Sequence, residues 1–268
     1  MIDLGKKNLL GVQIDAVDYE AAVGRFVEAA KLSKRLTVTA LAVHGVMTGA
    51  LDSQHRHRLN SLDLVVPDGM PVRWGVNLLH GAGLPDRVYG PKLMLKVCEA
   101  AEKHGLPLYF FGTQRDTLDK LIENLRVKFP EIKIAGSEPS QFRKISEQES
   151  IALAERIRSS GAKITFVGLG CPRQEVWAYE LGDELCMPVF AVGAAFPFHA
   201  GTLRQAPLWM QNYGLEWLFR FISEPRRLWK RYVYLNPAFV TLVGLQLLKL
   251  RTVYPNETKA PSQKERFG

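Results

Sequence analysis

The sequence predicts an α/β fold with a mainly parallel sheet that carries helices on both faces, followed by a helical C-terminal appendage. Apolar, β-prone runs alternate with stretches of helical spacing up to Gly201, which is typical of repeated strand–helix units. The apolar runs are continuous, as expected for strands buried on both faces. After Gly201 tryptophan and arginine gather. We therefore expect a core over residues 1–201, a basic and aromatic appendage over residues 202–251, and a disordered polar tail over residues 252–268.

The expected elements follow from these patterns. Asp18 has the side chain and the position of an N-cap, for a helix that runs to about Leu32 with Ala21, Phe26 and Ala29 toward the core. The expected strands cover residues 9–14 (a strand or hairpin arm), 36–42, 63–66, 106–111, 132–135, 162–167 and 189–192. The other expected helices cover residues 44–59, 71–79, 91–103, 114–128, 147–159 and 173–181.

Charge and cysteine content narrow the function classes. The 268 residues include 35 Lys and Arg against 27 Asp and Glu, a net charge of +8 that indicates an anionic partner: nucleic acid, phosphate esters or an acidic membrane surface. The three cysteines show no Cys-x-x-Cys spacing, so neither a disulfide framework nor a zinc site is expected. The six histidines show no metal-ligand spacing, and residues 55–57 (His-Arg-His) resemble a solvated helix face.

Hydropathy predicts neither a signal peptide nor a transmembrane span. Asp15, Asp18 and Glu20 interrupt the only N-terminal segment in which an apolar signal core would lie. The longest apolar candidate, residues 237–250, contains Gln246 and Lys249 and is shorter than the roughly 20 residues that a span needs. A reducing cytosol is the expected compartment.

Asp68 is the first candidate for chemistry. Val65 and Val66 suit a buried strand, Pro67 ends it, and Gly69 permits a sharp turn before a helix. Asp68 is therefore expected at the carboxyl end of a strand, the edge of an α/β sheet where ligands bind. The alternative is an ordinary turn in which the carboxylate bonds its own backbone.

Three glycine-bearing loops also follow expected strands. They cover residues 112–113, 168–172 and 193–195, and include Gly168, Gly170 and Gly193. Glycine permits close approach of a phosphate, and the positive end of a following helix favours an anion. Each loop alone is also plain turn material. Three of them on one sheet edge predict a cleft for a nucleotide diphosphate.

The appendage interleaves aromatic and basic residues. Trp209, Trp217 and Trp229 alternate with arginines and lysine and precede the short apolar stretch. A helix in a membrane interface needs cations for anionic headgroups and aromatic rings at the boundary. The alternative is an extension whose tryptophans pack on the core and whose arginines are solvated.

Several short motifs occur together in this one chain. They are PDGMP (67–71), RVYGP (87–91), GLGCPRQE (168–175), GLEWLFR (214–220), EPRR (224–227) and KRY (230–232). As a set they resemble the WecG/TagA/CpsF family of bacterial glycosyltransferases. The resemblance implies a Rossmann-like fold and transfer of a sugar, with inversion, from a UDP-sugar donor to an undecaprenyl-diphosphate-linked acceptor. It also implies a peripheral protein on the cytoplasmic, anionic face of the plasma membrane, with no cofactor.

The same resemblance assigns residues. The family's proposed base falls on Asp68, its strand-end threonine on Thr39, and its Pro-[KR]-Gln-Glu motif on Gln174 and Glu175, which are expected to fix a uridine or sugar. Gln174 is otherwise a helix-surface residue. Arg87 is expected to pair with the donor diphosphate, or else to form a structural salt bridge. Arg220, Arg227 and Arg231 match positions from which the family closes basic side chains over the site to stabilise the UDP leaving group.

Two departures from the family pattern bear on the chemistry. Leu41 stands where the family commonly has asparagine, with His44 or Thr48 the nearest polar substitute, although an isolated histidine there is more often a core residue. Pro197 stands where the family has an acid. These losses imply a different donor sugar or a weakened enzyme.

The sequence leaves other functions open. It contains no Asp-x-Asp pair, which favours a metal-independent glycosyltransferase. A non-catalytic scaffold of polysaccharide assembly is the alternative that the two departures raise. The positive charge makes nucleic-acid binding another alternative function, although no nucleic-acid partner is expected. The oligomeric state is open, a homo-oligomer included.

Overall fold

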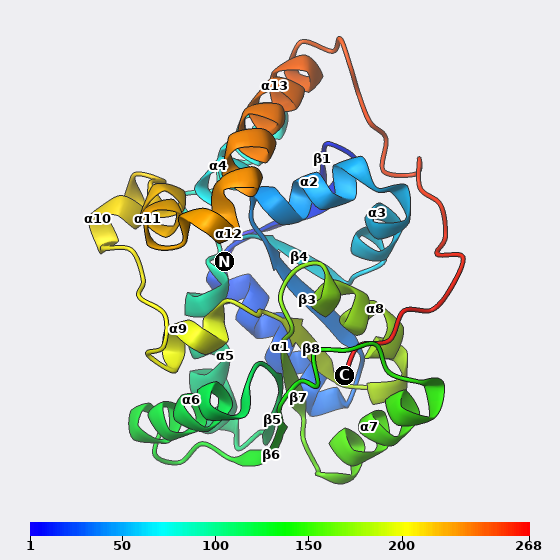
Figure 1. Cartoon of the computed structure of the whole chain (residues 1–268), viewed down its shortest axis with the longest axis vertical. Coiled ribbons are helices and arrows are strands. Elements are labelled where there is room, and N and C mark those ends of the chain that lie inside the picture. The colour runs from blue at the N-terminus through cyan, green and yellow to red at the C-terminus, as the bar shows by residue number, and fades with distance from the viewer.

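The computed structural model describes the backbone of all 268 residues and all side chains except those of Arg227, Lys230 and Arg231. Its centre is a sheet of six parallel strands in the order β4-β3-β8-β7-β5-β6 (Figure 1). The strands are β3 (Leu36–Leu41), β4 (Leu64–Pro67), β5 (Leu108–Gly112), β6 (Ile134–Glu138), β7 (Ile164–Gly168) and β8 (Pro188–Ala191). The expected mainly parallel sheet is confirmed.

Helices cover both faces of this sheet and bury its continuous apolar strands. One face packs against α1 (Tyr19–Leu32), α5 (Gly90–His104), α6 (Arg115–Lys128) and the short α9 (Ala195–His199). The other face packs against α2 (Val43–Leu51), α3 (Ser53–Asn60), α4 (Met70–His80), α7 (Glu147–Ser159) and α8 (Arg173–Leu185). Because all six strands are parallel, the loops after them meet at one edge of the sheet.

The N-terminus forms a hairpin rather than one strand. β1 (Asp3–Leu9) and β2 (Val12–Val17) pair antiparallel, so the expected strand over residues 9–14 spans the turn between them. Leu10 and Gly11 both have positive φ, the conformation that a two-residue hairpin turn requires. The N-cap prediction for Asp18 is confirmed, since its Oδ1 accepts from Ala21 N at 2.8 Å.

The expected helix over residues 44–59 is two helices, α2 and α3. Asp52 separates them, and its carboxylate accepts from Gln54 N at 2.8 Å and His55 N at 3.1 Å, which caps α3. The face containing His55 and Arg56 is buried rather than solvated. The chain after residue 252 causes this burial, because it runs across α3 and the Glu257 carbonyl accepts from the Arg56 guanidinium.

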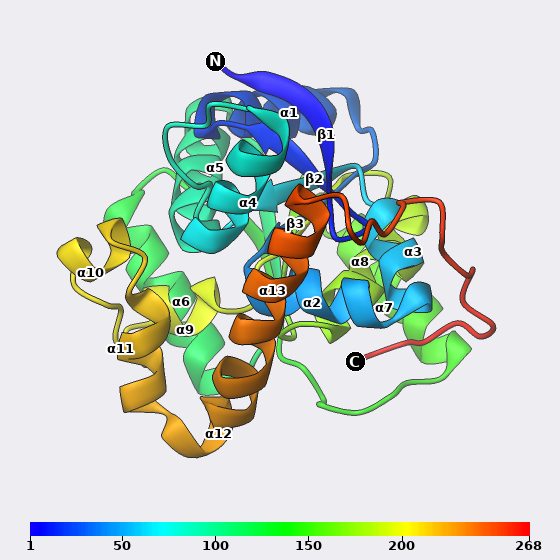
Figure 2. The ribbon, with the colours of Figure 1, turned by 90° about the horizontal axis from the view of Figure 1, so that it is seen from above.

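The appendage is helical and returns to the core. It contains α10 (Leu208–Asn212), α11 (Glu216–Ser223), α12 (Pro225–Lys230), a π-helical turn η1 (Arg231–Leu235) and α13 (Asn236–Leu247). Figure 2 shows α10 to α12 gathered on one side of the molecule, with α13 crossing back over the core. Phe239 and Val243 of α13 are buried in the same cluster as α2 and α4. Among the described residues, no helix is both long enough and apolar enough to cross a membrane.

The tail runs along the surface without helix or extended strand. It lies beside the core at several points, where Asn8 and Asn60 donate to the carbonyls of Val253 and Pro255. Further on, Phe267 forms a single bridge with Lys144. The division into core, appendage and tail remains a prediction.

Candidate functional site

Two cavities open where the parallel strands end, and Asp68 lines both. The loop cavity, of about 530 Å³, is formed mainly by the loops after β7 and β8 and includes Gly170, Gln174 and Gly193. The apolar cavity, of about 120 Å³, lies between the core and the appendage and includes Met70, Trp217 and Tyr232. His44 and Arg220 also line both cavities. The carboxylate therefore lies where a group in one cavity can meet a group in the other.

Backbone groups fix Asp68 in this position. Its N–H donates to the Leu41 carbonyl at 3.1 Å, which ties the end of β4 to β3. Its Oδ1 accepts from Gly90 N at 2.9 Å, at the start of α5. Glycine at position 90 leaves room for this close packing, because a Cβ there would lie 3.0 Å from Ala40 Cβ and 3.2 Å from Val192 Cγ2. One carboxylate oxygen is thus oriented by the backbone, and the expected strand-end placement of Asp68 is what the structure shows.

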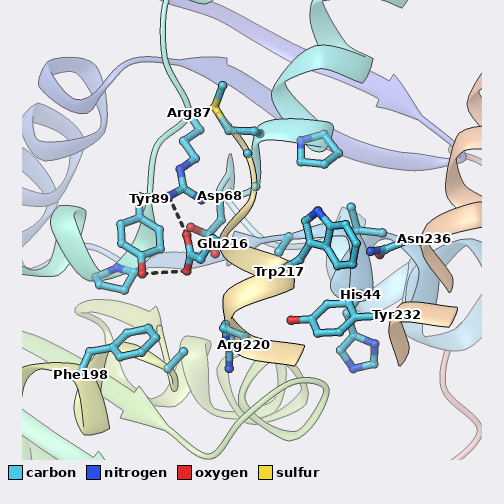
Figure 3. A pocket seen from close by; sticks show the side chains of 18 residues that line it. His44, Asp68, Arg87, Tyr89, Phe198, Glu216, Trp217, Arg220, Tyr232 and Asn236 are labelled. Atoms are coloured by element: carbon cyan, nitrogen blue, oxygen red, sulfur yellow. Dashed lines mark hydrogen bonds and ion pairs between the residues drawn. The ribbon is translucent and has the colours of Figure 1, made fainter. Parts of the chain in front are cut away.

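A charged cluster from the core and the appendage lies beside Asp68 (Figure 3). Arg87 donates to Glu216 Oε2 at 2.7 Å, and the Tyr89 hydroxyl donates to Glu216 Oε1 at 3.0 Å. The Arg87 guanidinium also lies 4.2 Å from the centre of the Tyr89 ring. Arg87 therefore forms a buried salt bridge, the second of the two roles that the sequence left open. Contact of Arg87 with a diphosphate remains a prediction.

The surroundings of Asp68 raise its pKa to about 6. Burial is the largest cause, because it disfavours the charged carboxylate, and the negative charge of Glu216 acts in the same direction. Arg87, the Gly90 N–H and Arg220 oppose the rise. A carboxyl with this pKa is ionised at neutral pH and is a stronger base than an exposed aspartate.

A buried polar network forms part of the wall of the loop cavity. The Thr39 hydroxyl donates to Glu175 Oε1 at 3.0 Å, and Gln174 Nε2 donates to the same oxygen at 2.9 Å. Gln174 Oε1 accepts from Gly170 N at 3.1 Å and Gly193 N at 2.8 Å. Gln174 thereby joins the loops after β7 and β8. Burial raises the pKa of the Glu175 carboxyl.

The predicted substrate-binding residues divide into those that line the cavities and those beneath them. Gly170, Gly193, Gln174 and Glu175 line the loop cavity. Thr39 is fully buried, and neither it nor Gly168 lines either cavity.

Two of the predicted glycines make room for neighbouring groups. A Cβ on Gly168 would lie 2.6 Å from the Phe196 ring, and one on Gly193 would lie 2.3 Å from Gln174 Oε1. Phosphate binding by these loops therefore remains a prediction.

Of the three predicted appendage arginines, Arg220 reaches the site. Its guanidinium lies 5.8 Å from the centre of the Phe198 ring, at the wall between the two cavities. The side chains of Arg227 and Arg231 lie outside the described residues, so their predicted contacts with the leaving group are untested. In the described part of the chain, no three His, Cys, Asp or Glu side chains are grouped as a metal site requires.

The two departures from the family pattern have different surroundings. Leu41 is 1% exposed, packs in the hydrophobic core against Gly45 and also lines the loop cavity. Pro197 lines the loop cavity within α9. Both departures therefore border the loop cavity, and either can alter what the cavity accepts.

Sequence reasoning missed Tyr89 and Glu216 as site residues. Both stand inside motifs that the sequence analysis singled out, RVYGP and GLEWLFR, but 127 residues separate them. No local pattern shows that they meet.

A comparison with protein families covers almost the whole chain. Residues 7–253, nearly the whole chain, match the model described as the glycosyl transferase WecG/TagA/CpsF family. The match includes Asp68, the loops after β7 and β8, and all of the appendage helices.

Proposed function

The chain belongs to the WecG/TagA/CpsF family of glycosyltransferases, which act in cell-surface polysaccharide biosynthesis, and we propose that it transfers a sugar from a UDP-sugar to a polyprenyl-diphosphate-linked saccharide with inversion. The observation that carries this proposal is the place of Asp68 at the junction of two cavities. Its carboxylate is oriented through Oδ1 by Gly90.

An inverting transfer needs one base in this position. The acceptor hydroxyl attacks the anomeric carbon from the face opposite the phosphate, and Asp68 takes its proton. A bond forms between the acceptor oxygen and the anomeric carbon as the bond from that carbon to the phosphate oxygen breaks. UDP leaves with the electron pair.

The linings of the cavities favour an assignment of substrates. The loop cavity is the larger, and its glycine loops and Gln174 suit a nucleotide diphosphate and sugar. The apolar cavity, with Trp217 and Tyr232, suits the acceptor, because a sugar ring stacks on aromatic side chains and a polyprenyl chain is apolar.

Fixed positive charge is proposed to stabilise the UDP leaving group without a metal ion. Arg220 lines both cavities and can face a diphosphate that bridges them. The helices α2, α5 and α8 begin at the loop cavity and present the positive ends of their dipoles. Arg227 and Arg231 are proposed to add to this charge.

A donor screen tests the proposed activity. We expect one UDP-sugar to release UDP only when a short-chain polyprenyl diphosphate saccharide is also present. UDP release is measured across a panel of UDP-sugars, with and without the acceptor. Absence of acceptor-dependent release across the panel would instead support the non-catalytic scaffold.

The appendage is proposed to bind the cytoplasmic face of the plasma membrane peripherally. Leu208, Trp209 and Ile222 are exposed on α10 and α11, which lie together on one side of the molecule (Figure 2). Exposed apolar groups beside arginines fit an anionic lipid interface.

Replacing Leu208, Trp209 and Ile222 together by serine is expected to abolish flotation with anionic vesicles. The exposed side chains supply the apolar area that would enter the interface. Substitution is preferable to truncation near Ile222, because truncation would remove the buried Phe239 and Val243. Flotation is measured on vesicles with and without anionic lipid.

The control replaces three exposed apolar residues outside the appendage, Leu51, Val127 and Ile151, by serine. This variant should float like the unmodified protein. Equal flotation of both triple variants would contradict membrane binding through α10 and α11.

A further inference from the structure

Glu216 is an appendage residue whose carboxylate lies inside the core's active site. It belongs to the first turn of α11, and its side chain is only 13% exposed. Both of its oxygens accept from core residues, Arg87 and Tyr89, which precede α5 by a few residues. The same α5 begins with the Gly90 N–H that orients Asp68. A single carboxylate thus joins the appendage to the segment that holds the base.

We propose that Glu216 is a positioning residue of the transfer reaction. It holds Arg87 and Tyr89 beside Asp68, and Asp68 reaches its full strength as a base only when the appendage lies on the core. The inference rests on the proposed function, because it assigns Asp68 the role of base. It gives the appendage a part in the chemistry that is separate from membrane binding.

The charges around Asp68 give the physical reason. Arg87 attracts the Asp68 carboxylate electrostatically and weakens it as a base, whereas Glu216 repels it. With Glu216 in place, the Arg87 guanidinium is directed to a second carboxylate at 2.7 Å. Asp68 is the other carboxylate whose negative charge acts on Arg87, so it becomes the main partner once Glu216 is neutralised.

Other groups face Asp68 as well. Arg220 of α11 opposes Glu216, the Gly90 N–H of α5 stabilises the ionised form, and Tyr19 and Tyr89 lie within electrostatic reach. His44 of α2 lines the same cavities. Substitution of Glu216 with glutamine leaves every one of these side chains in the sequence and removes one negative charge, and the amide oxygen can still accept from Tyr89.

Glu216→Gln is expected to shift the titration of Asp68 to lower pH by about one unit, since one repelling charge is lost and Arg87 is released. The test is a pH titration of the intact protein labelled with ¹³C at the aspartate carboxyl carbons, with Asp68→Asn to assign the signal. The unmodified protein should titrate with a pKa of about 6. This measurement needs no substrate.

Kinetics give a second readout. In Glu216→Gln, the acidic limb of the kcat/KM profile should move to lower pH by the same amount, and kcat should fall by about threefold to tenfold, because a base of lower pKa takes the proton less readily. Glu216→Asp keeps the charge and should keep the limb at its original pH. A purely structural role would lower the plateau and leave the limb unmoved.

Glu224→Gln is the matched control, because it removes the appendage's other acid, which lines neither cavity. It should leave both the titration and the limb unchanged. An unshifted Asp68 titration in Glu216→Gln would overturn the inference while the proposed function stands. Full transfer by Asp68→Asn would instead overturn the proposed function.

Discussion

Asp68→Asn is expected to lower the rate of sugar transfer by about 10²- to 10⁴-fold, the contribution typical of a general base. Asparagine keeps the size of the side chain and an oxygen that accepts from Gly90 N, so the start of α5 should stay in place. The amide cannot take a proton from the acceptor hydroxyl. The rate is measured as UDP release with the donor and acceptor identified by the screen.

Binding measurements separate the loss of a base from the loss of a site. The variant should bind UDP as the unmodified protein does and should unfold at a similar urea concentration. Asp119→Asn, on the exposed surface of α6 where Asp119 pairs only with Arg115 among the described residues, is the matched control and should retain full activity. A rate loss in Asp68→Asn below about threefold would remove Asp68 from the role of base.

The fold could be predicted from sequence because its signals are local. Continuous apolar runs mark buried parallel strands, and the Asp18 cap marks the start of α1. The prediction of one continuous helix over residues 44–59 was wrong, and the reason is also local. Asp52 can continue a helix or cap a new one, and its hydrogen bonds to Gln54 and His55 decide for the cap.

What the sequence could not provide is contact between distant segments. His55 and Arg56 were predicted to be solvated, because no residue near them in the sequence indicates that residues 253–258 cover α3. The partners of Arg87 were undecided for the same reason, since Glu216 lies 129 residues further on. Asp68 was accessible to sequence reasoning because Pro67 and Gly69 mark the strand end on which it stands.

The predicted roles of Thr39 and Leu41 also change once packing is known. Thr39 was expected to bind substrate as the family's strand-end threonine, and Leu41 stands where the family commonly has a polar asparagine. Residues two apart on a strand point to the same face, so both side chains lie on the α8 side of the sheet, where Leu41 packs in the core and its carbonyl accepts from Asp68 N. Thr39 itself lies beneath the loop cavity and donates to Glu175 in its wall. A strand-end motif therefore fixes where the backbone lies but not which side chains meet the substrate.

Glu175→Ala is expected to destabilise the protein by about 3–5 kcal/mol, because it leaves the Thr39 hydroxyl and the Gln174 amide buried without their shared acceptor and creates a cavity. Glu184→Ala, on the exposed side of the same helix, is the control and should change the free energy of unfolding by less than about 0.5 kcal/mol. Urea unfolding measures both values. Equal stability of the two variants would contradict a structural role for Glu175.

Glu175→Gln separates the hydrogen bonds of this group from its charge. The amide oxygen can accept from Thr39 and Gln174, so the variant should be far more stable than Glu175→Ala. Burial raises the pKa of Glu175 above its ordinary 4.5, so the folded state holds a proton that the unfolded state releases as the pH rises past that value. The unmodified protein should therefore lose stability with rising pH above 4.5 relative to Glu175→Gln. A constant difference across that range would mean that Glu175 ionises in the folded protein as it does in the unfolded chain, and that hydrogen bonding alone holds the network together.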